Sequence, residues 1–578
     1  MIGSLCAVLR FLVVCVIALP VVLSAGLGEA LIDAARSDDQ AAAAALVAQG
    51  ADVNLREDDG TTSLAWAVVR SNAEIAELLL DAGANPDLAN ELGIGPLSLA
   101  IRHGSQGIVQ LLLEHGADPN VARENGETPL MTAARMGQVE AMRLLLDRGA
   151  DVNAREEKFG QTALMWSAGN PAAVRLLLER GADIRVSTKS WDVKYVIYAP
   201  TTFTLGKTGI PWNTSGEYVT KRGAQNALFF AVQERDLESA RMLADAGLDV
   251  HSAAADGTTP LLASLYKWVA PDGEFVPGKG GPALAGSSQV FGADLAMSRF
   301  LLDRGATATA ADGAGYTPLH GAALAVANAE RSGRKGEGGE YRRAAALLAL
   351  GPPRDALGFS PDEALEIARR LLESGADPNQ QTIYPTPGPP GDVRINPAPP
   401  GSSAFHIAAG SGSTALVEML ADAGADPNLV RKDGHTPFSV AVVAGDLPIV
   451  KELVAYGADL SARYDPDDKI PDPVEAVTLS RQDQTVMHIA AARLSPGIVE
   501  YLHSKGAPID WKNRQGETPL DLADHQERFQ EALKRQGAEG DPTRLAKVVR
   551  PTETTDAIKK LLARPADKTA GKRHLDGP

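Results

Sequence analysis

Apolar residues along this chain form a short run and then a longer one, with polar turns between them. Residues 125–157 show one such repeat. Thr128 and Pro129 precede the first run, where a hydroxyl can cap free helical N–H groups and proline suits the first turn. Gly149 follows the second run, where a left-handed helix cap is expected. Three- and four-residue spacing in that run predicts a second helix, with apolar residues Val139, Met142, Leu144, Leu145 and Leu146.

The same pattern recurs along most of the chain. A glycine that begins "GAD" or a close variant returns with spacings of 33, 33, 33 and 32 residues and then at intervals of 66, 58, 70, 49, 33 and 49 residues, at Gly50, Gly83, Gly116, Gly149, Gly181, Gly247, Gly305, Gly375, Gly424, Gly457 and Gly506. One helix pair cannot bury its apolar sides alone, whereas stacked pairs share a continuous core. We therefore predict an all-α solenoid of about 12 helix pairs over residues 29–537.

Two phrases resemble a known repeat family. "TPLH" at Thr317–His320 and "LLDRGADVNA" at Leu145–Ala154 resemble the ankyrin repeat. The resemblance implies antiparallel helix pairs, β-hairpin-like fingers and a curved solenoid whose concave face binds other proteins. It also implies that a histidine at the start of the first helix makes structural hydrogen bonds between repeats, as expected for His320, His406 and His488. More narrowly, "KFGQTALMWSAG" at Lys158–Gly169 and the N-terminal leader resemble secreted bacterial ankyrin-repeat proteins.

Five inserts interrupt the repeats, near 186–220, 269–290, 328–362, 380–400 and 462–482. In the first, "VKYVIYA" and "TTFTL" predict the two strands of a β-hairpin. Four of its aromatic residues are candidates for contact with a partner: Trp191, Tyr195, Tyr198 and Trp212. The alternative is that they pack the insert onto its own repeats. Residues 540–578 form a polar tail that we expect to be largely flexible, with a short helix around 555–563.

The N-terminal residues 1–25 are typical of a signal peptide. One basic residue, Arg10, precedes a short apolar core at 11–23 with Pro20 inside it, and small residues follow. The two cysteines, Cys6 and Cys15, both lie in this leader, which suits an oxidising compartment. We therefore expect a periplasmic or secreted bacterial protein. The alternative is a protein anchored in the inner membrane by residues 11–25.

Composition narrows the classes of partner. The formal net charge is -17 and the pI about 5.1, so nucleic acid is not expected as a partner, and a membrane only if the leader is uncleaved. We find no metal-binding, cofactor-binding or catalytic motif, and we expect no small-molecule substrate. One alternative is an enzyme or enzyme subunit with its site in the inserts, from residues such as Asp192, Lys194, Glu217, Asp272 and Glu274. Another is an effector delivered into host cells.

The predicted function is that of a non-enzymatic exported scaffold for protein–protein interaction, acting through the concave face and the extended fingers. In the resembling family, the finger tips and the open side of the first helix contact partners. The matching positions here are Arg70, Arg102, His103, Arg135, Met136, Gln233 and Glu234. The alternative is that these charges only solvate the edge. Sequence alone does not identify the partner.

Overall fold

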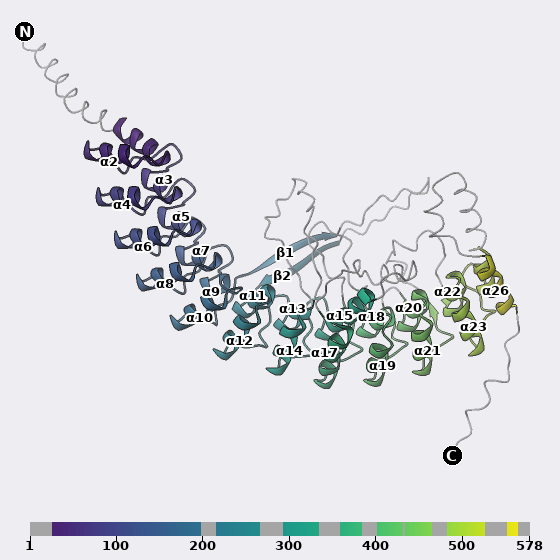
Figure 1. The fold of residues 1–578 in the computed structure, drawn as a ribbon. Coiled ribbons are helices and arrows are strands. Elements are labelled where there is room, and N and C mark those ends of the chain that lie inside the picture. Colours follow the sequence, from purple (N-terminus) through teal and green to yellow (C-terminus); the bar gives the residue numbers. More distant parts are fainter. Residues whose placement is uncertain are drawn as a thin grey trace, which may run out of the picture. The chain divides into compact units, whose positions relative to one another are not determined.

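The computed structural model describes residues 26–197, 216–265, 293–333, 359–383, 401–431, 434–464, 483–525 and 552–563. It is built almost entirely of short antiparallel helix pairs joined by turns (Figure 1). The chain divides into two units, which we call the N-terminal unit (Met1–Asp192 and Lys221–Asp249) and the C-terminal unit (Val193–Thr220 and Val250–Pro578).

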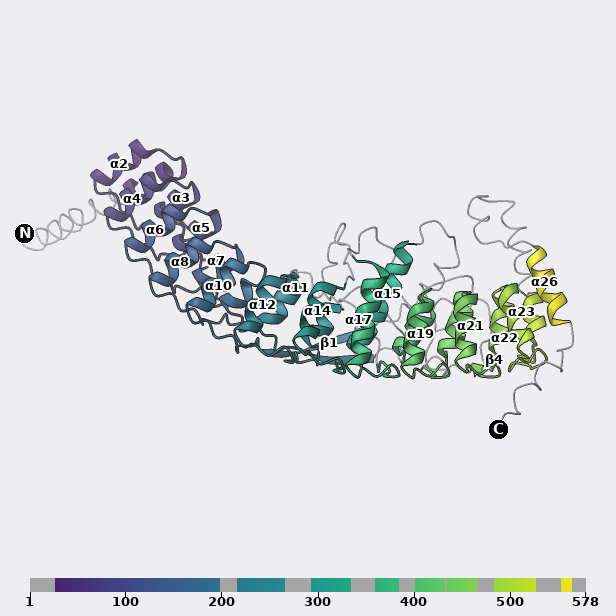
Figure 2. The same ribbon diagram turned by 60° about the horizontal axis from the view of Figure 1, so that its bottom comes forward.

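Helices of the N-terminal unit form two rows, as both ribbon views show (Figure 2). The first row holds the leading helix of each pair, and each of its members contacts the next: α3 (Ser63–Val69), α5 (Pro96–His103), α7 (Pro129–Arg135), α9 (Ala163–Trp166) and α11 (Ala227–Glu234). The second row is built in the same way from α2 (Gln40–Ala48), α4 (Ala73–Asp81), α6 (Gln106–Glu114), α8 (Val139–Asp147), α10 (Pro171–Glu179) and α12 (Leu237–Asp245). A further helix, 26–36, precedes α2.

The C-terminal unit repeats this two-row arrangement. Its first row comprises α13 (Pro260–Leu265), α15 (Pro318–Gly333), α18 (Ala404–Ala409), α20 (Pro437–Ala444) and α22 (Val486–Ala492). Its second row comprises α14 (Leu295–Asp303), α17 (Pro361–Glu373), α19 (Thr414–Asp422), α21 (Leu447–Ala455) and α23 (Pro496–Ser504). Helix 519–525 follows, and the residues directly after it lie outside the described part. The expected number of about 12 pairs therefore stays a prediction.

The local signals in residues 125–157 act as the sequence predicts. The Thr128 hydroxyl accepts a hydrogen bond from the Met131 N–H at 3.3 Å, and Pro129 occupies the first turn of α7. Gly149 has φ +87°, the left-handed conformation expected after α8. Leu130 and Leu145 are 1% and 0% exposed, so both helices turn their apolar sides into the core between the rows.

Asparagines in the turns tie each repeat to the next. Asn120 donates from Nδ2 to the Gly149 carbonyl at 3.0 Å, and its Oδ1 accepts from the Asp151 N–H at 2.7 Å. The same bridge recurs at Asn54, Asn153, Asn379 and Asn428. The sequence predicts turn chemistry here, and the structure adds that the side chain satisfies backbone groups of the following repeat.

Buried histidines perform a similar task in the C-terminal unit. His320 accepts from the Thr317 N–H at Nδ1, at 3.2 Å, and its Nε2 lies 3.1 Å from the Ser402 carbonyl. His406 and His488 make the equivalent pair of contacts. Because Nδ1 accepts, the proton lies on Nε2 and is donated to the next repeat. The expected structural role of these histidines is confirmed.

The first insert contains a two-stranded sheet, but its pairing differs from the expected hairpin. Strand β1 (Ser190–Ile197) covers most of the first predicted strand, and its partner is β2 (Gly216–Gly223). The expected partner, "TTFTL" at 201–205, lies outside the described residues. Pro200 and the glycines after 205 suggested an early turn, whereas the chain returns to pair only at 216. A second short sheet joins β3 (Arg463–Tyr464) to β4 (Gln484–Thr485), antiparallel.

Part of the C-terminal tail is ordered against the last described helix pair. Helix α26 (Thr552–Leu562) begins three residues before the expected helix and contacts α23, with Ile558 0% and Leu562 6% exposed. A helix here agrees with the short helix expected around 555–563, and its two apolar side chains one turn apart are buried, as expected for a helix that packs on a neighbour. The flexibility expected for the rest of the tail stays a prediction, because those residues lie outside the described part. Residues 1–25, predicted to be a signal peptide, and most of the other inserts lie outside the described residues.

Candidate functional site

The candidate residues at the ends of the leading helices lie along one row. They occupy equivalent positions near the C-terminal ends of first-row helices in the N-terminal unit. We call this surface the helix-end face and define it by Arg36, Trp66, Arg70, Leu99, Arg102, His103, Arg135, Met136, Trp166, Phe230, Gln233 and Glu234. Arg70, Arg102, His103, Arg135, Met136 and Glu234 are exposed, and the other six are half-buried.

The first of two arginine–tryptophan stacks lies at the start of this face. The Arg36 guanidinium lies 4.9 Å from the Trp66 ring centroid, within the range of a cation–π contact. The indole N–H of Trp66 donates to Glu57 Oε2 at 2.6 Å, and Arg36 forms an ion pair with the other oxygen of Glu57. The hydrogen bond to Glu57 is the main cause that raises the pKa of Arg36. Glu57 thus fixes both members of the stack.

A second stack repeats this arrangement further along the row. The Arg135 guanidinium lies 4.9 Å from the Trp166 ring centroid, and the Trp166 indole donates to Gln161 Oε1 at 2.6 Å. In both stacks the arginine ends the leading helix of one pair, and the tryptophan lies on the leading helix of the next pair. A side chain from the turn before the tryptophan's helix accepts the hydrogen bond of the indole. Neither tryptophan was singled out in the sequence. The signal that could have identified them is a tryptophan at the helix position where α5 has Leu99 and α7 has Thr132.

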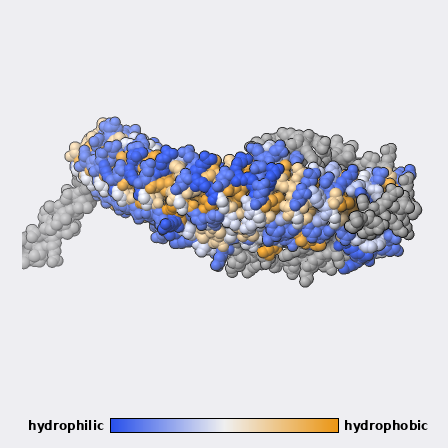
Figure 3. All heavy atoms as spheres, turned by 90° about the horizontal axis from the view of Figure 1, so that it is seen from below, coloured by the Kyte–Doolittle hydropathy of each residue, from blue (hydrophilic) through white to orange (hydrophobic). Residues whose placement is uncertain are grey.

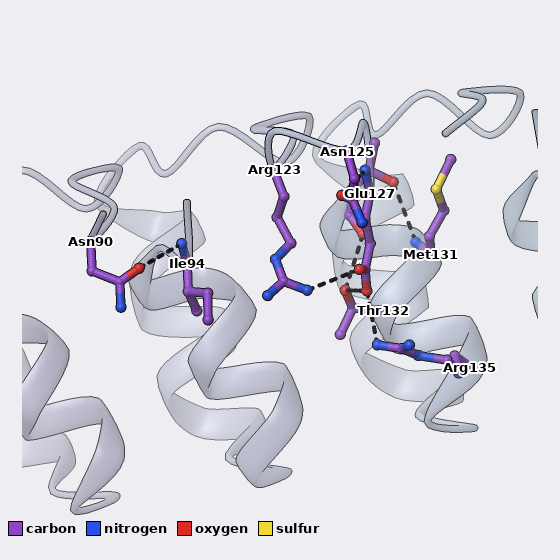
Figure 4. A network of polar contacts seen from close by, with 9 residues as sticks. Asn90, Ile94, Arg123, Asn125, Glu127, Met131, Thr132 and Arg135 are labelled. Carbon is purple, nitrogen blue, oxygen red and sulfur yellow. Dashed lines mark hydrogen bonds and ion pairs between the residues drawn. The ribbon is translucent and has the colours of Figure 1, made fainter. Parts of the chain in front are cut away.

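Glu127 is the buried centre of the network around Arg135. Its side chain is 4% exposed, and Arg123 and Arg135 each donate to it at 2.9 Å, from the turn and from the helix end respectively (Figure 4). The Thr132 hydroxyl donates to it at 2.9 Å as well. Two guanidinium groups and a hydroxyl therefore satisfy a carboxylate that burial would otherwise destabilise.

Between the two stacks the face presents arginines without acidic partners in the described part. Arg102 and His103 form no hydrogen bond or ion pair through their side chains with the residues that the structure describes. Arg70 donates from Nε to the Arg36 carbonyl at 2.7 Å, and no carboxylate of the described part pairs with it. Leu99 lies one turn before Arg102 on α5. The middle of the face is thus basic and partly apolar.

The corresponding helix ends of the C-terminal unit are different. Gly410 and Ser411 stand on α18 where α5 has Arg102 and His103, and Ser411 is 0% exposed. Val443 and Ala444 stand at those places on α20, where Val443 is 5% exposed. Small, buried residues at these positions cannot present long side chains to a partner. The end of α22 is an exception, since the half-buried Arg493 holds the place that Arg70 holds on α3, so the contrast with the N-terminal unit applies to α18 and α20.

Among the aromatic residues of the first insert, the structure describes Trp191. Its ring centroid lies 4.9 Å from that of Phe159 in the preceding turn, and it is 38% exposed. This contact favours packing of the insert onto its own repeat, with part of the ring left open. Tyr195 lies in β1, but its side chain is outside the described part, as are Tyr198 and Trp212. Their role as partner contacts stays a prediction.

Two other kinds of site were sought in the described residues, a metal site and a membrane-spanning helix. In the described ranges, no group of three or more His, Cys, Asp or Glu side chains is placed to hold a metal ion. No described helix has the length and apolarity needed to cross a bilayer. Viewed from below, the surface is mixed, with hydrophobic patches among hydrophilic residues (Figure 3).

Comparison with known proteins agrees with the helix pairs. A family model described as ankyrin repeats in three copies matches residues 31–123, 97–188 and 360–464. The chain is 39% identical over 119 residues to cyclin-dependent kinase 4 inhibitor B of Rattus norvegicus, covering 21% of this chain and 79% of that protein. It is 36% identical over 124 residues to the same inhibitor of Bos taurus, covering 22% and 82%.

A third relative is much longer than the matched region. The chain is 34% identical over 123 residues to the transient receptor potential cation channel subfamily A member 1 homolog of Caenorhabditis elegans, covering 21% of this chain and only 9% of that protein. All three relatives are animal proteins. They give no support to the narrower resemblance to secreted bacterial proteins, which stays a prediction.

Proposed function

This chain belongs to the ankyrin-repeat family, and from that premise we propose that it is a non-catalytic scaffold that binds a protein partner through the helix-end face and the adjoining turns. Ankyrin repeats generally serve as protein–protein interaction modules. The rat and bovine relatives are, by name, inhibitors of a kinase, which means that they act on another protein. The single observation that carries the proposal is the open row of arginine, tryptophan and methionine side chains.

The residue types of this row support the proposal energetically. Trp, Arg and Met are enriched in the buried centres of protein interfaces, and Trp and Arg dominate binding hot spots. Trp66 and Trp166 are held by hydrogen bonds of 2.6 Å through their indole N–H groups, so little side-chain freedom remains to be lost on binding. Met136 is 50% exposed and supplies a flexible apolar contact next to Arg135.

A capture experiment with matched variants tests the proposal. Met136→Glu combined with Arg102→Glu places two carboxylates on the helix-end face, and Ala45→Glu combined with Arg143→Glu makes the same charge change on exposed second-row positions. Proximity labelling in the native host should identify a protein that the control variant retains and the face variant loses. Equal labelling by both variants, with circular dichroism showing both folded, would contradict a role for this face.

We also propose that the protein is exported from a bacterial cell, to the periplasm or beyond. The support is residues 1–25, a short apolar segment whose cysteines are the only two of the chain. Cell fractionation, with N-terminal sequencing of the purified protein, should find it outside the cytoplasm and beginning near residue 25. Recovery of the full-length chain in the membrane fraction would favour the anchored alternative, and recovery from cytoplasm would refute export.

A further inference from the structure

We propose that the helix-end face recognises an acidic amphipathic segment of its partner, in which carboxylates alternate with apolar or aromatic side chains. This inference rests on the proposed function and specifies its partner class. It assigns a basic site to a chain whose formal net charge is -17. Its support is the charge balance of the face, the order of side chains along α3 and α5, and the contrast with α18 and α20 of the C-terminal unit.

The charge balance follows from which groups are already paired. Glu57 is engaged by Arg36 and by the Trp66 indole, and Glu127 is engaged by two guanidinium groups and a hydroxyl. These carboxylates therefore have little capacity left to neutralise neighbouring cations. Arg70 and Arg102 pair with no carboxylate of the described part. Planar guanidinium groups of this kind bind carboxylates in bidentate fashion.

Apolar and cationic side chains follow the same order on successive helices. On α3 Trp66 precedes Arg70 by one turn, and on α5 Leu99 precedes Arg102 by one turn. Residues three or four positions apart lie on the same face of a helix. On α3 and α5 an apolar side chain thus lies at one edge of the face and an arginine at the other, whereas α11 has Phe230 followed by the exposed carboxylate of Glu234. A segment that fits both edges must itself have an apolar side and an acidic side.

The overall negative charge does not prevent this local recognition. Salt at physiological strength screens exposed charges beyond about 8 Å, so a bound segment responds mainly to the arginines that it touches. A long polyanion such as nucleic acid would extend past the face toward the acidic remainder of the chain and be repelled. A short acidic protein segment is attracted by the arginines of the face without extending to the acidic remainder of the chain.

Selection from a library of short random peptides displayed on phage, using the full chain as bait, tests the inference. The enriched peptides should carry more Asp and Glu than Lys and Arg, together with a Leu, Phe or Trp. A synthetic enriched peptide should bind Arg70→Glu/Arg102→Glu at least about tenfold more weakly than the unmodified chain. The control variant Arg143→Glu/Arg175→Glu has the same charge change on the second row, and it should bind within about twofold of the unmodified chain.

The possible outcomes separate the inference from the proposed function. If the enriched peptides are neutral or basic, and the variant Met136→Glu/Arg102→Glu no longer binds them, the inference of an acidic partner is refuted and the proposed binding face is retained. Acidic peptides bound equally by both double variants would overturn the inference, as would their displacement by an equimolar single-stranded oligonucleotide. No face-dependent peptide, together with no captured protein, would overturn both proposals.

Discussion

At the scale of single residues, Glu127 is the side chain on which most of the local order of the candidate site depends. It joins a turn to a helix end, since Arg123 comes from the turn and Arg135 from the end of α7. Arg135 in turn lies against Trp166 of the next helix pair. One buried carboxylate therefore positions part of a neighbouring repeat's exposed surface. Its loss should be felt both in stability and in binding.

Replacing Glu127 by Gln should lower the free energy of unfolding by about 2 kcal/mol. The side chain keeps its size, but two guanidinium groups lose their buried counter-charge. The expected loss is smaller than for a fully buried ion pair because the Arg135 side chain is 52% exposed and partly hydrated. Guanidinium unfolding measures the change. Glu140→Gln, which removes an exposed pair to Arg143 at 3.4 Å, is the control and should change stability by under about 0.5 kcal/mol.

The buried histidines give the C-terminal unit a pH dependence of definite sign. Burial lowers the pKa of His320 from 6.5 to about 4, and burial lowers the pKa of His488 as well. Between pH 6.5 and about 4 the unfolded chain binds a proton that folded His320 does not bind, and His488 acts in the same direction. Stability should therefore fall as pH decreases through this window, with His320 contributing about 2 kcal/mol of loss between pH 7 and pH 5.

Unfolding midpoints in guanidinium at pH 7 and pH 5 measure this loss. In His320→Asn the difference between the two pH values should shrink, because the titrating group is gone, even though the variant starts less stable. His103→Asn, at an exposed position of the N-terminal unit, should keep the full difference. An unchanged difference in the His320 variant would show that another group carries the pH dependence.

At the scale of elements, two glycines show that the backbone conformation of a glycine decides how its replacement by alanine changes stability. A Cβ added to either Gly107 or Gly149 would meet nothing within 4 Å, so space is not the issue at either site. Gly107 lies inside α6, where alanine has the higher helix propensity. Gly149 has φ +87° at the end of α8, a conformation that costs alanine energy.

The two alanine substitutions should therefore act in opposite directions. Gly107→Ala should raise the free energy of unfolding by about 0.5–1 kcal/mol, and Gly149→Ala should lower it by about 1–2 kcal/mol. Thermal unfolding followed by circular dichroism compares the two directly, each serving as the other's control. Destabilisation by both would mean that Gly107 has a role beyond propensity.

At the scale of the whole molecule, the C-terminal unit is closed at one end by a helix outside the repeat pattern. Helix α26 contacts α23 and buries Ile558 and Leu562. An ion pair of 2.5 Å between Lys559 and Asp524 adds a polar contact. Terminal repeats of a stack need a covered or polar outer side, because they have no further neighbour. We interpret α26 as part of this covering.

Replacing Ile558 by Ala should weaken the attachment of α26 by about 2–4 kcal/mol. Because the contact is local, hydrogen exchange should accelerate in α23 and remain unchanged in α3 and α4 of the N-terminal unit. Mass spectrometry of the exchanged peptides gives this spatial pattern. Lys560→Ala, at an exposed position of α26, is the matched control and should leave α23 protected. Uniform acceleration across the chain would contradict a local capping role.

The sequence by itself determined the repeated helix pair and its boundaries. The signals involved are local: Thr128 caps a group three residues away, and Gly149 needs only its own backbone conformation. Interactions of this kind depend on a few adjacent residues, so the sequence alone reveals them. The recurrence of the helix pair along the chain then predicts that the pairs stack. The resemblance to the ankyrin repeat, rather than this local chemistry, named Arg70, Arg102 and Arg135 as candidate contact residues.

Only the tertiary structure decided which helix ends are open and how their side chains are held. Arg36 on Trp66 and Arg135 on Trp166 join residues from neighbouring helix pairs, so no local pattern encodes the contact. The partner strand of β1 and the attachment of α26 likewise depend on segments far apart in the chain. Burial at Ser411 and exposure at His103, in equivalent positions, arise from what packs nearby, which spacing along the chain cannot specify.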